Sequence, residues 1–376
     1  MSDKIQPLSG IKVLDFTTLL PGPLAGLMLA EAGAEVIKIE RPEGEDMRHF
    51  VPRWGDASVL YHLLNRGKKC ITLDLKDPAN GTSIENLIGE ADVVLEQFRP
   101  GVMDRLGIGY EACRKINPKI IFCSITGYGA TGPKANVAGH DLNYIGDTGL
   151  LALSMGDKHA PILPPALIAD IGGGSMPAVI NVLLALLQRD KTGEGSHIDI
   201  AMSDAMFMFG YWALAEGQTT GKWPGSGAGL LTGGSPRYHI YPTSDGRHVA
   251  AAPLEQRFWM VFCELIELAP ELRNDLIDPG KTIAAVAEII ASKPSDYWAK
   301  IFAGQDCCCT IVASMEEAAE DTHFKERGLF SHRISNGKGE TIPAAVVAVA
   351  PQFRGDARKT VDAPALGADN EIDVKN

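Results

Sequence analysis

Short runs rich in Val and Ile alternate with longer helical patterns through the first third of the chain. Ile11–Phe16 and Ala34–Glu40 predict strands. Between them, Pro21 and Pro23 predict the start of an apolar helix that continues through Leu24–Ala32 and ends at Gly33. Three more strand-like runs follow, separated by helical patterns: Lys69–Leu75, Ala91–Glu96 and Lys119–Ile125.

This alternation predicts βαβ units and a fold of the α/β class. Consecutive units of this kind wind right-handed into an open, doubly wound, Rossmann-like parallel sheet. The strand-like runs are apolar almost without interruption, which is typical of strands covered by helices on both faces. We therefore expect a large domain built around such a sheet.

From about Gly127 onward the chain becomes rich in Gly and Pro, and two apolar helices are predicted beyond it. One is Met176–Leu187, and the other, Met202–Ala215, is rich in Met and aromatic residues. The first belongs to an uncharged stretch, Ile171–Gln188, whose length is borderline for a membrane span. Because the stretch includes three successive glycines and Pro177, we favour a buried core helix.

A hairpin signature marks a second, smaller domain of the α+β type. Tyr238–Tyr241 and His248–Ala252 flank a turn that contains Asp245-Gly246. Helical patterns follow over Gln256–Leu268 and Thr282–Phe302. The expected division is therefore a large domain over 1–224 with a linker helix, a small domain over 225–330, and a C-terminal segment, 331–376, that returns to the large domain.

Composition and charge narrow the classes of protein that the chain can be. It carries 35 Lys and Arg against 47 Asp and Glu, a formal charge of −12. This balance argues against a surface that binds nucleic acid, but a local basic cluster could still hold a small polyanionic ligand. The first residues contain no apolar segment, and the seven cysteines match neither a disulfide framework nor a zinc pair. We expect a cytoplasmic protein with free thiols, no metal site and no membrane span.

Two segments concentrate candidate chemistry: Gly139-His140-Asp141, and Asp170 followed by three glycines. Asp170 has the sequence context of a helix N-cap, and a lone His is often structural. A carboxylate beside exposed backbone N–H groups could equally serve catalysis, because such groups stabilise an oxyanion or enolate. Gly127, Gly129 and Gly132 match a dinucleotide fingerprint, but they follow the fifth strand and precede Pro133, which disfavours an NAD or FAD site.

Eight short blocks in order resemble the family III CoA-transferases (CaiB/BaiF type), and among them the α-methylacyl-CoA racemases. The resemblance covers nearly the whole chain. The blocks are PLSGIKVLDFTTLLPGPLAG, AEVIKIERP, NRGKKCITLDLK, ADVVLEQFRPGVMDRLGIGY, TGYGATGP, AGHDLNYI, ADIGGGSM and DGRHVAAAPLEQRFW. Gln256 and Arg257 depart from the Pro-Gln pair that is common in the family, which puts the acyl specificity in doubt more than the reaction.

The resemblance implies a proton transfer at the carbon next to a thioester. His140 and Asp170 would be the two acid/base groups, and an enolate-like intermediate would form between them. Burial should raise the pKa of Asp170, since it must be protonated in one direction. Glu255 or Asp141 would orient the imidazole. In the alternative, a family III acyl-CoA:carboxylate CoA-transferase, Asp170 is the nucleophile. A CoA-binding protein without activity is a third possibility.

The resemblance also implies how coenzyme A is bound and how the chain assembles. The basic candidates for its phosphates are Arg41, Arg66, Lys68, Lys69, Lys76, Arg99 and Lys134. Leu73, Val94 and Leu95 could pack near the adenine, Gly139 could contact the ligand, and Met202, Met206 and Met208 could face the acyl chain. No cofactor is expected beyond the CoA moiety of the substrate. An interlocked homodimer is expected, which would bring Glu255 to the His140 of the partner subunit.

Overall fold

The computed structural model describes residues 6–154, 162–356 and 359–374. The chain divides into two compact units. Unit 1 comprises 1–145, 167–206 and 321–376, and unit 2 comprises 146–166 and 207–320. The boundaries predicted at 224/225 and 330/331 therefore lie too late in the chain, and 146–166 belongs to unit 2. That short Gly- and Pro-rich passage carries no hydrophobic period from which its partner could have been predicted.

Unit 1 is built on a six-stranded sheet in which every pair of neighbouring strands is parallel. The strand order is β5-β2-β1-β6-β7-β8. The strands are β1 (Lys12–Asp15), β2 (Glu35–Glu40), β5 (Lys69–Thr72), β6 (Val93–Glu96), β7 (Ile121–Thr126) and β8 (Ser196–Ala201). Numbered within the sheet, this is the doubly wound order 3-2-1-4-5-6, so the expected parallel sheet is confirmed.

The order of the strands fixes where a ligand crevice can form. From β1 the chain builds outward to β2 and β5 on one side, and from β6 to β7 and β8 on the other. The crossovers therefore change direction between β1 and β6. Loops that leave the carboxyl ends of these two strands diverge at that point, which leaves a crevice at the edge of the sheet.

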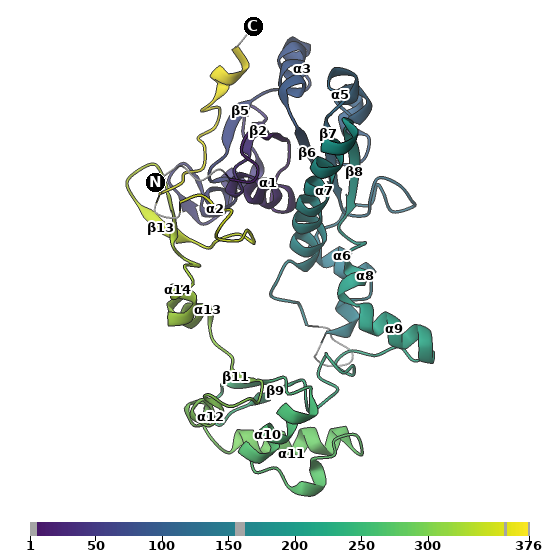
Figure 1. Cartoon of the computed structure of the whole chain (residues 1–376), viewed down its shortest axis with the longest axis vertical. Helices are drawn as coiled ribbons and strands as arrows, with labels where there is room; N and C mark the ends of the chain where they lie inside the picture. The colour runs from purple at the N-terminus through teal and green to yellow at the C-terminus, as the bar shows by residue number, and fades with distance from the viewer. Residues whose placement is uncertain (1–5, 155–161, 357–358, 375–376) are drawn as a thin grey trace. The chain divides into compact units, whose positions relative to one another are not determined.

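Helices cover both faces of the sheet (Figure 1). On one face, α3 and α5 bury apolar side chains against the strands, with Leu14, Ile37 and Phe122 at the centre of the cluster. On the other face, α1 and α7 contact the strands and each other. The helices of this unit are α1 (Pro21–Glu31), α2 (Val59–Asn65), α3 (Gly81–Glu90), α4 (Val102–Arg105), α5 (Tyr110–Ile116), α6 (Asp141–Asp147, which runs into unit 2), α7 (Met176–Thr192) and α14 (Thr322–Glu326). Two small hairpins complete it: β3 (Arg53–Trp54) with β4 (Ala57–Ser58), and β12 (His332–Ser335) with β13 (Thr341–Ala344).

A buried network of charged side chains lies on the α1 side of the sheet. The Lys68 ammonium is fully buried and donates to Asp15 Oδ2 at 2.8 Å, to Asn65 Oδ1 at 2.9 Å and to the Pro23 carbonyl at 2.9 Å. The Lys38 ammonium, also fully buried, pairs with Glu45 Oε1 at 3.1 Å. Arg48 donates to both carboxylate oxygens of Glu40 at 2.8 Å. The members carry three positive and three negative charges: Lys38, Lys68, Arg48, Asp15, Glu40 and Glu45.

Helix α7 leaves much of its apolar surface exposed within the chain. By length and composition, the helical stretch Ala169–Thr192 could cross a membrane, and 39% of its most apolar window is buried. Ile180, Leu184 and Leu187 are each more than half exposed. The prediction of a buried core helix therefore holds for the face of α7 that carries Ala178 and Val182, which lie in the core, and is wrong for the opposite face.

Unit 2 contains a three-stranded antiparallel sheet, β11-β10-β9, packed against helices. Its strands are β9 (His239–Pro242), β10 (His248–Ala251) and β11 (Cys309–Ile311), and its helices are α8 (Met206–Phe209, which begins in unit 1), α9 (Tyr211–Thr220), α10 (Gln256–Leu265), α11 (Pro279–Ala291), α12 (Ser295–Phe302) and α13 (Met315–Glu320). The β9–β10 hairpin is confirmed. All seven cysteines of the chain are free thiols, as expected.

Two predicted helices prove to be interrupted. Met202–Ala215 is divided into α8 and α9 at Gly210, and Thr282–Phe302 is divided into α11 and α12 before Ser295. Pro294 explains the second break, because proline disfavours helical backbone at the preceding residue and cannot donate a helical hydrogen bond. The hydrophobic period runs through both breaks, so periodicity alone could not reveal them.

Candidate active site

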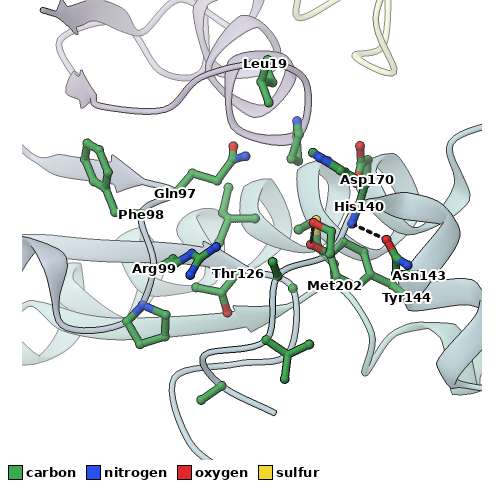
Figure 2. Close-up of a pocket in the computed structure, with 18 residues that line it drawn as sticks. Leu19, Gln97, Phe98, Arg99, Thr126, His140, Asn143, Tyr144, Asp170 and Met202 are labelled. Atoms are coloured by element: carbon green, nitrogen blue, oxygen red, sulfur yellow. Dashed lines mark hydrogen bonds between the residues drawn. The ribbon is translucent and has the colours of Figure 1, made fainter.

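A pocket of about 410 Å³ opens at the carboxyl ends of four strands of the sheet (Figure 2). Its walls come from the loops after β1 and β6, from the end of β7, from Met202 directly after β8, and from the segments around His140 and Asp170. The position agrees with the switch point between β1 and β6. The lining residues include Leu19, Pro21, Gln97, Phe98, Arg99, Thr126, Gly139, His140, Asn143, Tyr144, Asp170 and Met202.

His140 is held at the start of a helix and exposes its side chain to the pocket. It directly precedes α6, and its backbone N–H donates to Asn143 Oδ1 at 3.0 Å. The Asn143 N–H in turn donates to the His140 carbonyl at 2.8 Å. This reciprocal pair resembles one half of a capping box, with Asn143 in the position usually held by Glu or Gln. The backbone of His140 is therefore fixed by its own helix.

Asp170 lies within a π-helical turn, Ala169–Ser175, that runs into α7. The turn begins before Asp170, its N-cap residue is Ile168, and no side chain makes a capping hydrogen bond there. The interpretation of Asp170 as an N-cap is therefore wrong. Turns of this type are rare and often occur at functional sites, because the extra residue redirects a side chain. Here the turn places the carboxyl of Asp170 in the pocket wall near His140 (Figure 2).

Asp141 ties the two candidate groups together. Its Oδ1 atom accepts hydrogen bonds from the backbone N–H groups of Ala169 at 2.7 Å and Asp170 at 2.9 Å. Asp141 is buried and directly follows His140 in the chain. One carboxylate oxygen thus fixes the distance between the segment that carries His140 and the turn that carries Asp170. This contact is to the turn, whereas we had expected Asp141 to orient the imidazole.

The surroundings of Asp170 favour its neutral form. Burial raises the pKa of its carboxyl to about 6, and the nearby charge of Asp141 acts in the same direction, while His140 opposes it. The expectation of a raised pKa is therefore confirmed. Burial of Tyr144, together with the nearby charges of Asp170 and Asp141, raises the pKa of its phenol to about 12. The Tyr144 hydroxyl donates to the Gly139 carbonyl at 2.5 Å. Tyr144 thus acts as a hydrogen-bond donor at neutral pH.

The raised pKa of Asp170 predicts a stability cost at neutral pH. The folded protein binds this proton more tightly than the unfolded chain does, so the contribution is present at low pH and is lost as the pH rises through about 6. Asp170→Asn should therefore raise the free energy of unfolding at pH 8, by at most about 3 kcal/mol. Urea unfolding between pH 5 and 8 measures the difference, which should shrink toward pH 5. A gain that does not depend on pH would contradict the assignment.

The glycines that follow Asp170 allow close packing. A Cβ atom on Gly173 would lie 2.3 Å from the Met202 carbonyl oxygen, and one on Gly174 would lie 3.0 Å from Pro21 Cβ. Ser175 Oγ donates to the Pro21 carbonyl at 2.7 Å. Gly173 and Gly174 are buried, so they do not supply the exposed backbone N–H groups that we expected beside Asp170 for an oxyanion or enolate. They let the π-helical turn approach the loops after β1 and β8.

Among the residues expected to bind coenzyme A, only Arg99 and Gly139 line the pocket. The Arg41 guanidinium pairs with Asp46 and donates to the Gly44 carbonyl. Lys76 and Lys134 are exposed outside the pocket lining. Val94 and Leu95 are completely buried and Leu73 nearly so, which leaves no apolar surface for the adenine contact that we expected. Their apolar character reflects the core of the sheet.

Three other basic candidates also have structural partners. Lys68 belongs to the buried network, Arg66 pairs with Glu31 at 3.2 Å, and Lys69 pairs with Glu35 on the surface at 2.7 Å. Glu255 lies in unit 2, directly before α10, and its predicted role in the site stays a prediction. Groups of His, Cys, Asp and Glu that could hold a metal ion are absent from the described residues.

Sequence reasoning missed several residues of the pocket. Gln97 accepts the Gly22 N–H through Oε1 at 3.0 Å, and Thr126 Oγ1 accepts the Gly129 N–H at 2.9 Å. Both follow or end a strand at its carboxyl end, the place where parallel sheets position functional side chains. That signal was present in the sequence for Gln97, since it directly follows the predicted strand Ala91–Glu96.

The sequence model of the family described as CoA-transferase family III matches residues 8–370. The human protein named alpha-methylacyl-CoA racemase is 34% identical over 327 residues, which cover 86% of this chain and 82% of that protein. The mouse protein named succinyl-CoA:glutarate CoA-transferase is 36% identical over 338 residues, covering 87% of this chain and 77% of that protein.

Solved structures share the fold over almost the whole length of the chain. The crystal structure of Rv3272 from Mycobacterium tuberculosis superimposes with a TM-score of 0.85 at 27% identity and covers 99% of this chain and 100% of that one. A CAIB/BAIF family protein from Brucella suis gives a TM-score of 0.82, also at 27% identity, and covers 98% of each chain.

Proposed function

The chain belongs to CoA-transferase family III, and we propose that within this family it is an α-methylacyl-CoA racemase. The observation that carries the proposal is the pairing of His140 with Asp170 in one pocket, with the pKa of Asp170 raised to about 6. A racemase needs two groups that can each give and take a proton near neutral pH. An imidazole and a carboxyl group of raised pKa meet that requirement.

The proposed reaction inverts the carbon next to the thioester carbonyl. Neutral His140 takes the Cα proton from one epimer, and the electron pair of the broken C–H bond moves into an enolate. The protonated carboxyl of Asp170 then returns a proton to the opposite face of the carbon. The reverse direction starts from protonated His140 and the Asp170 carboxylate. The His140–Asp170 pair holds one proton at the start of either direction; it lies on Asp170 in the forward direction and on His140 in the reverse direction.

A family III acyl-CoA:carboxylate CoA-transferase is the second candidate, because relatives named succinyl-CoA:glutarate CoA-transferase match at 36% identity. In that reaction the Asp170 carboxylate attacks the thioester, forms an acyl anhydride and releases the CoA thiolate. The attack requires the ionised carboxylate. A carboxyl with a pKa of about 6 is still mostly ionised at neutral pH, so this pKa is compatible with both reactions, and the observation that favours the racemase is His140 in the same pocket.

Deuterium incorporation distinguishes the two reactions. We expect the protein to exchange the α-hydrogen of (R)- and (S)-2-methylacyl-CoA in deuterated water and to interconvert the two epimers, as followed by NMR and chiral chromatography. A transferase would instead form a hydroxylamine-sensitive adduct on Asp170 and move CoA to an added dicarboxylate. The racemase proposal fails if neither epimer exchanges while such an adduct forms.

We propose that Arg99 binds the CoA phosphates, because its side chain is exposed in the pocket wall, where an anionic ligand in the pocket could contact it. No other cofactor is proposed.

We also propose a homodimer, because the exposed apolar face of α7 is of the kind that subunit interfaces cover. Sedimentation equilibrium of the full chain would return the monomer mass if this assembly does not form.

A further inference from the structure

Leu19 has a backbone conformation that side chains rarely adopt. Its φ angle is 61°, and in the described part of the chain only Glu267 and Cys308 share a positive φ among residues other than glycine. Glycine is the ordinary residue for this left-handed region, because a Cβ atom crowds the neighbouring carbonyl there. A leucine held in it suggests that the side chain itself is needed.

A pair of buried charges holds the backbone of Leu19. Its N–H donates to Glu45 Oε2 at 2.9 Å, and Glu45 Oε1 pairs with the Lys38 ammonium at 3.1 Å. The Lys38 ammonium also donates to the Thr17 carbonyl at 2.7 Å. Both charged side chains are at least 98% buried. The loop after β1 is therefore held in place by hydrogen bonds to two buried charged side chains, Glu45 and Lys38.

This fixed backbone places the Leu19 side chain at the pocket wall, where it also packs against a small buried cluster of Met47, Ala57 and Tyr61. In Figure 2 Leu19 projects from the loop on one side, whereas Arg99 and Thr126 lie on the other. The anionic end of a CoA thioester would lie toward Arg99, and its reacting carbon toward His140 and Asp170. Leu19 is thus an apolar side chain at the part of the pocket that the nucleotide does not need.

We propose that Leu19 is a specificity-determining residue whose side chain packs against the acyl chain of the thioester, and that Glu45 and Lys38 position it. The inference rests on the proposed function, because it assumes an acyl-CoA ligand. It adds that the preferred substrates have an apolar chain long enough to reach this wall. The strained backbone is the feature that keeps the side chain aimed at the ligand.

Binding measurements on Leu19→Gly and Leu19→Asn test the proposal. Both residues tolerate positive φ, so the loop should keep its path. Isothermal titration should show that the preference of the protein for 2-methyldecanoyl-CoA over free CoA falls by about 10-fold in each variant, the value expected for losing one buried leucine contact. The Kd of free CoA should change by less than about 2-fold, because Leu19 lies on the side of the pocket away from Arg99.

Glu267→Gly is the matched control, because Glu267 has a φ of 57° but lies exposed in unit 2. It should gain stability without any change in ligand preference. The inference is overturned if the Leu19 variants keep the wild-type preference, or if they lose affinity for CoA and acyl-CoA equally and unfold earlier, as a purely structural leucine would. The deuterium exchange of the wild type is scored separately, so a protein that shows the Leu19 effect without exchange would refute the racemase alone.

Discussion

His140→Ala and Asp170→Asn should each strongly slow racemisation and yet leave opposite halves of the reaction intact. In the proposed mechanism each group lies on one side of the reacting carbon, so each removes the proton of one epimer only. His140→Ala should still exchange the α-hydrogen of the epimer that Asp170 deprotonates, and Asp170→Asn should exchange the other. Epimer interconversion should fall by about 10²–10⁴-fold in both variants, the range for loss of one general acid/base.

The measurement follows each pure epimer in deuterated water by NMR, with chiral analysis of the recovered thioester. His197→Ala is the matched control, because His197 lies on β8 and does not line the pocket. It should retain both exchange and inversion. A His140→Ala protein that still interconverts the epimers at the wild-type rate would contradict the two-group mechanism, and a variant that still transfers CoA to a carboxylate would favour the transferase.

Lys68→Met should lower the free energy of unfolding by about 3–5 kcal/mol, because it leaves Asp15 buried without its partner. Burial alone would raise the pKa of Asp15, but Lys68 and Lys38 beside it hold the pKa below its usual value. The loss is a large share of the stability that an ordinary domain possesses. Urea unfolding at pH 7, followed by circular dichroism, measures it.

The neighbouring residue supplies the control for this experiment. Lys69 pairs with Glu35 at 2.7 Å, yet both side chains are more than 40% exposed, so Lys69→Met should cost less than about 1 kcal/mol. The two substitutions remove the same group one residue apart. Equal losses would show that burial of the Lys68 pair adds nothing, and the view of the network as a folding determinant would be wrong.

These two lysines also show where sequence reasoning reaches its limit. Lys68 directly precedes the predicted strand Lys69–Leu75 and Lys69 is its first residue, and both were candidates for binding phosphate. Side chains of successive residues in a strand point to opposite faces of the sheet, so Lys68 and Lys69 have different surroundings. Which of the two packs near α1 and which is exposed to water depends on tertiary packing, which the local sequence does not show. Five of the six strands were predictable because their apolar runs are continuous, but right-handed crossovers alone do not fix the order of the strands in the sheet.

The candidate site was predictable in part for a related reason. His140 and Asp170 could be singled out from their motifs, but the contact that joins them, from Asp141 to the N–H groups of Ala169 and Asp170, spans 28 residues or more and a π-helical turn. The strained conformation of Leu19 left no trace in the sequence either. It depends on Glu45, which follows the next strand and looks like an ordinary surface acid in the sequence.

The C-terminal segment bears on how the chain is made in the cell. The outer strand β5 is covered at its open edge by the end of the chain, since the Cys70 N–H donates to Asp369 Oδ2 at 2.8 Å across 299 residues. Until that segment leaves the ribosome, the edge of β5 presents unpaired backbone groups to any other strand. At a synthesis rate of about 5–20 residues per second, this interval lasts about 15–60 s. The edge of β5 is therefore unprotected against mispairing for most of the time in which the chain is synthesised.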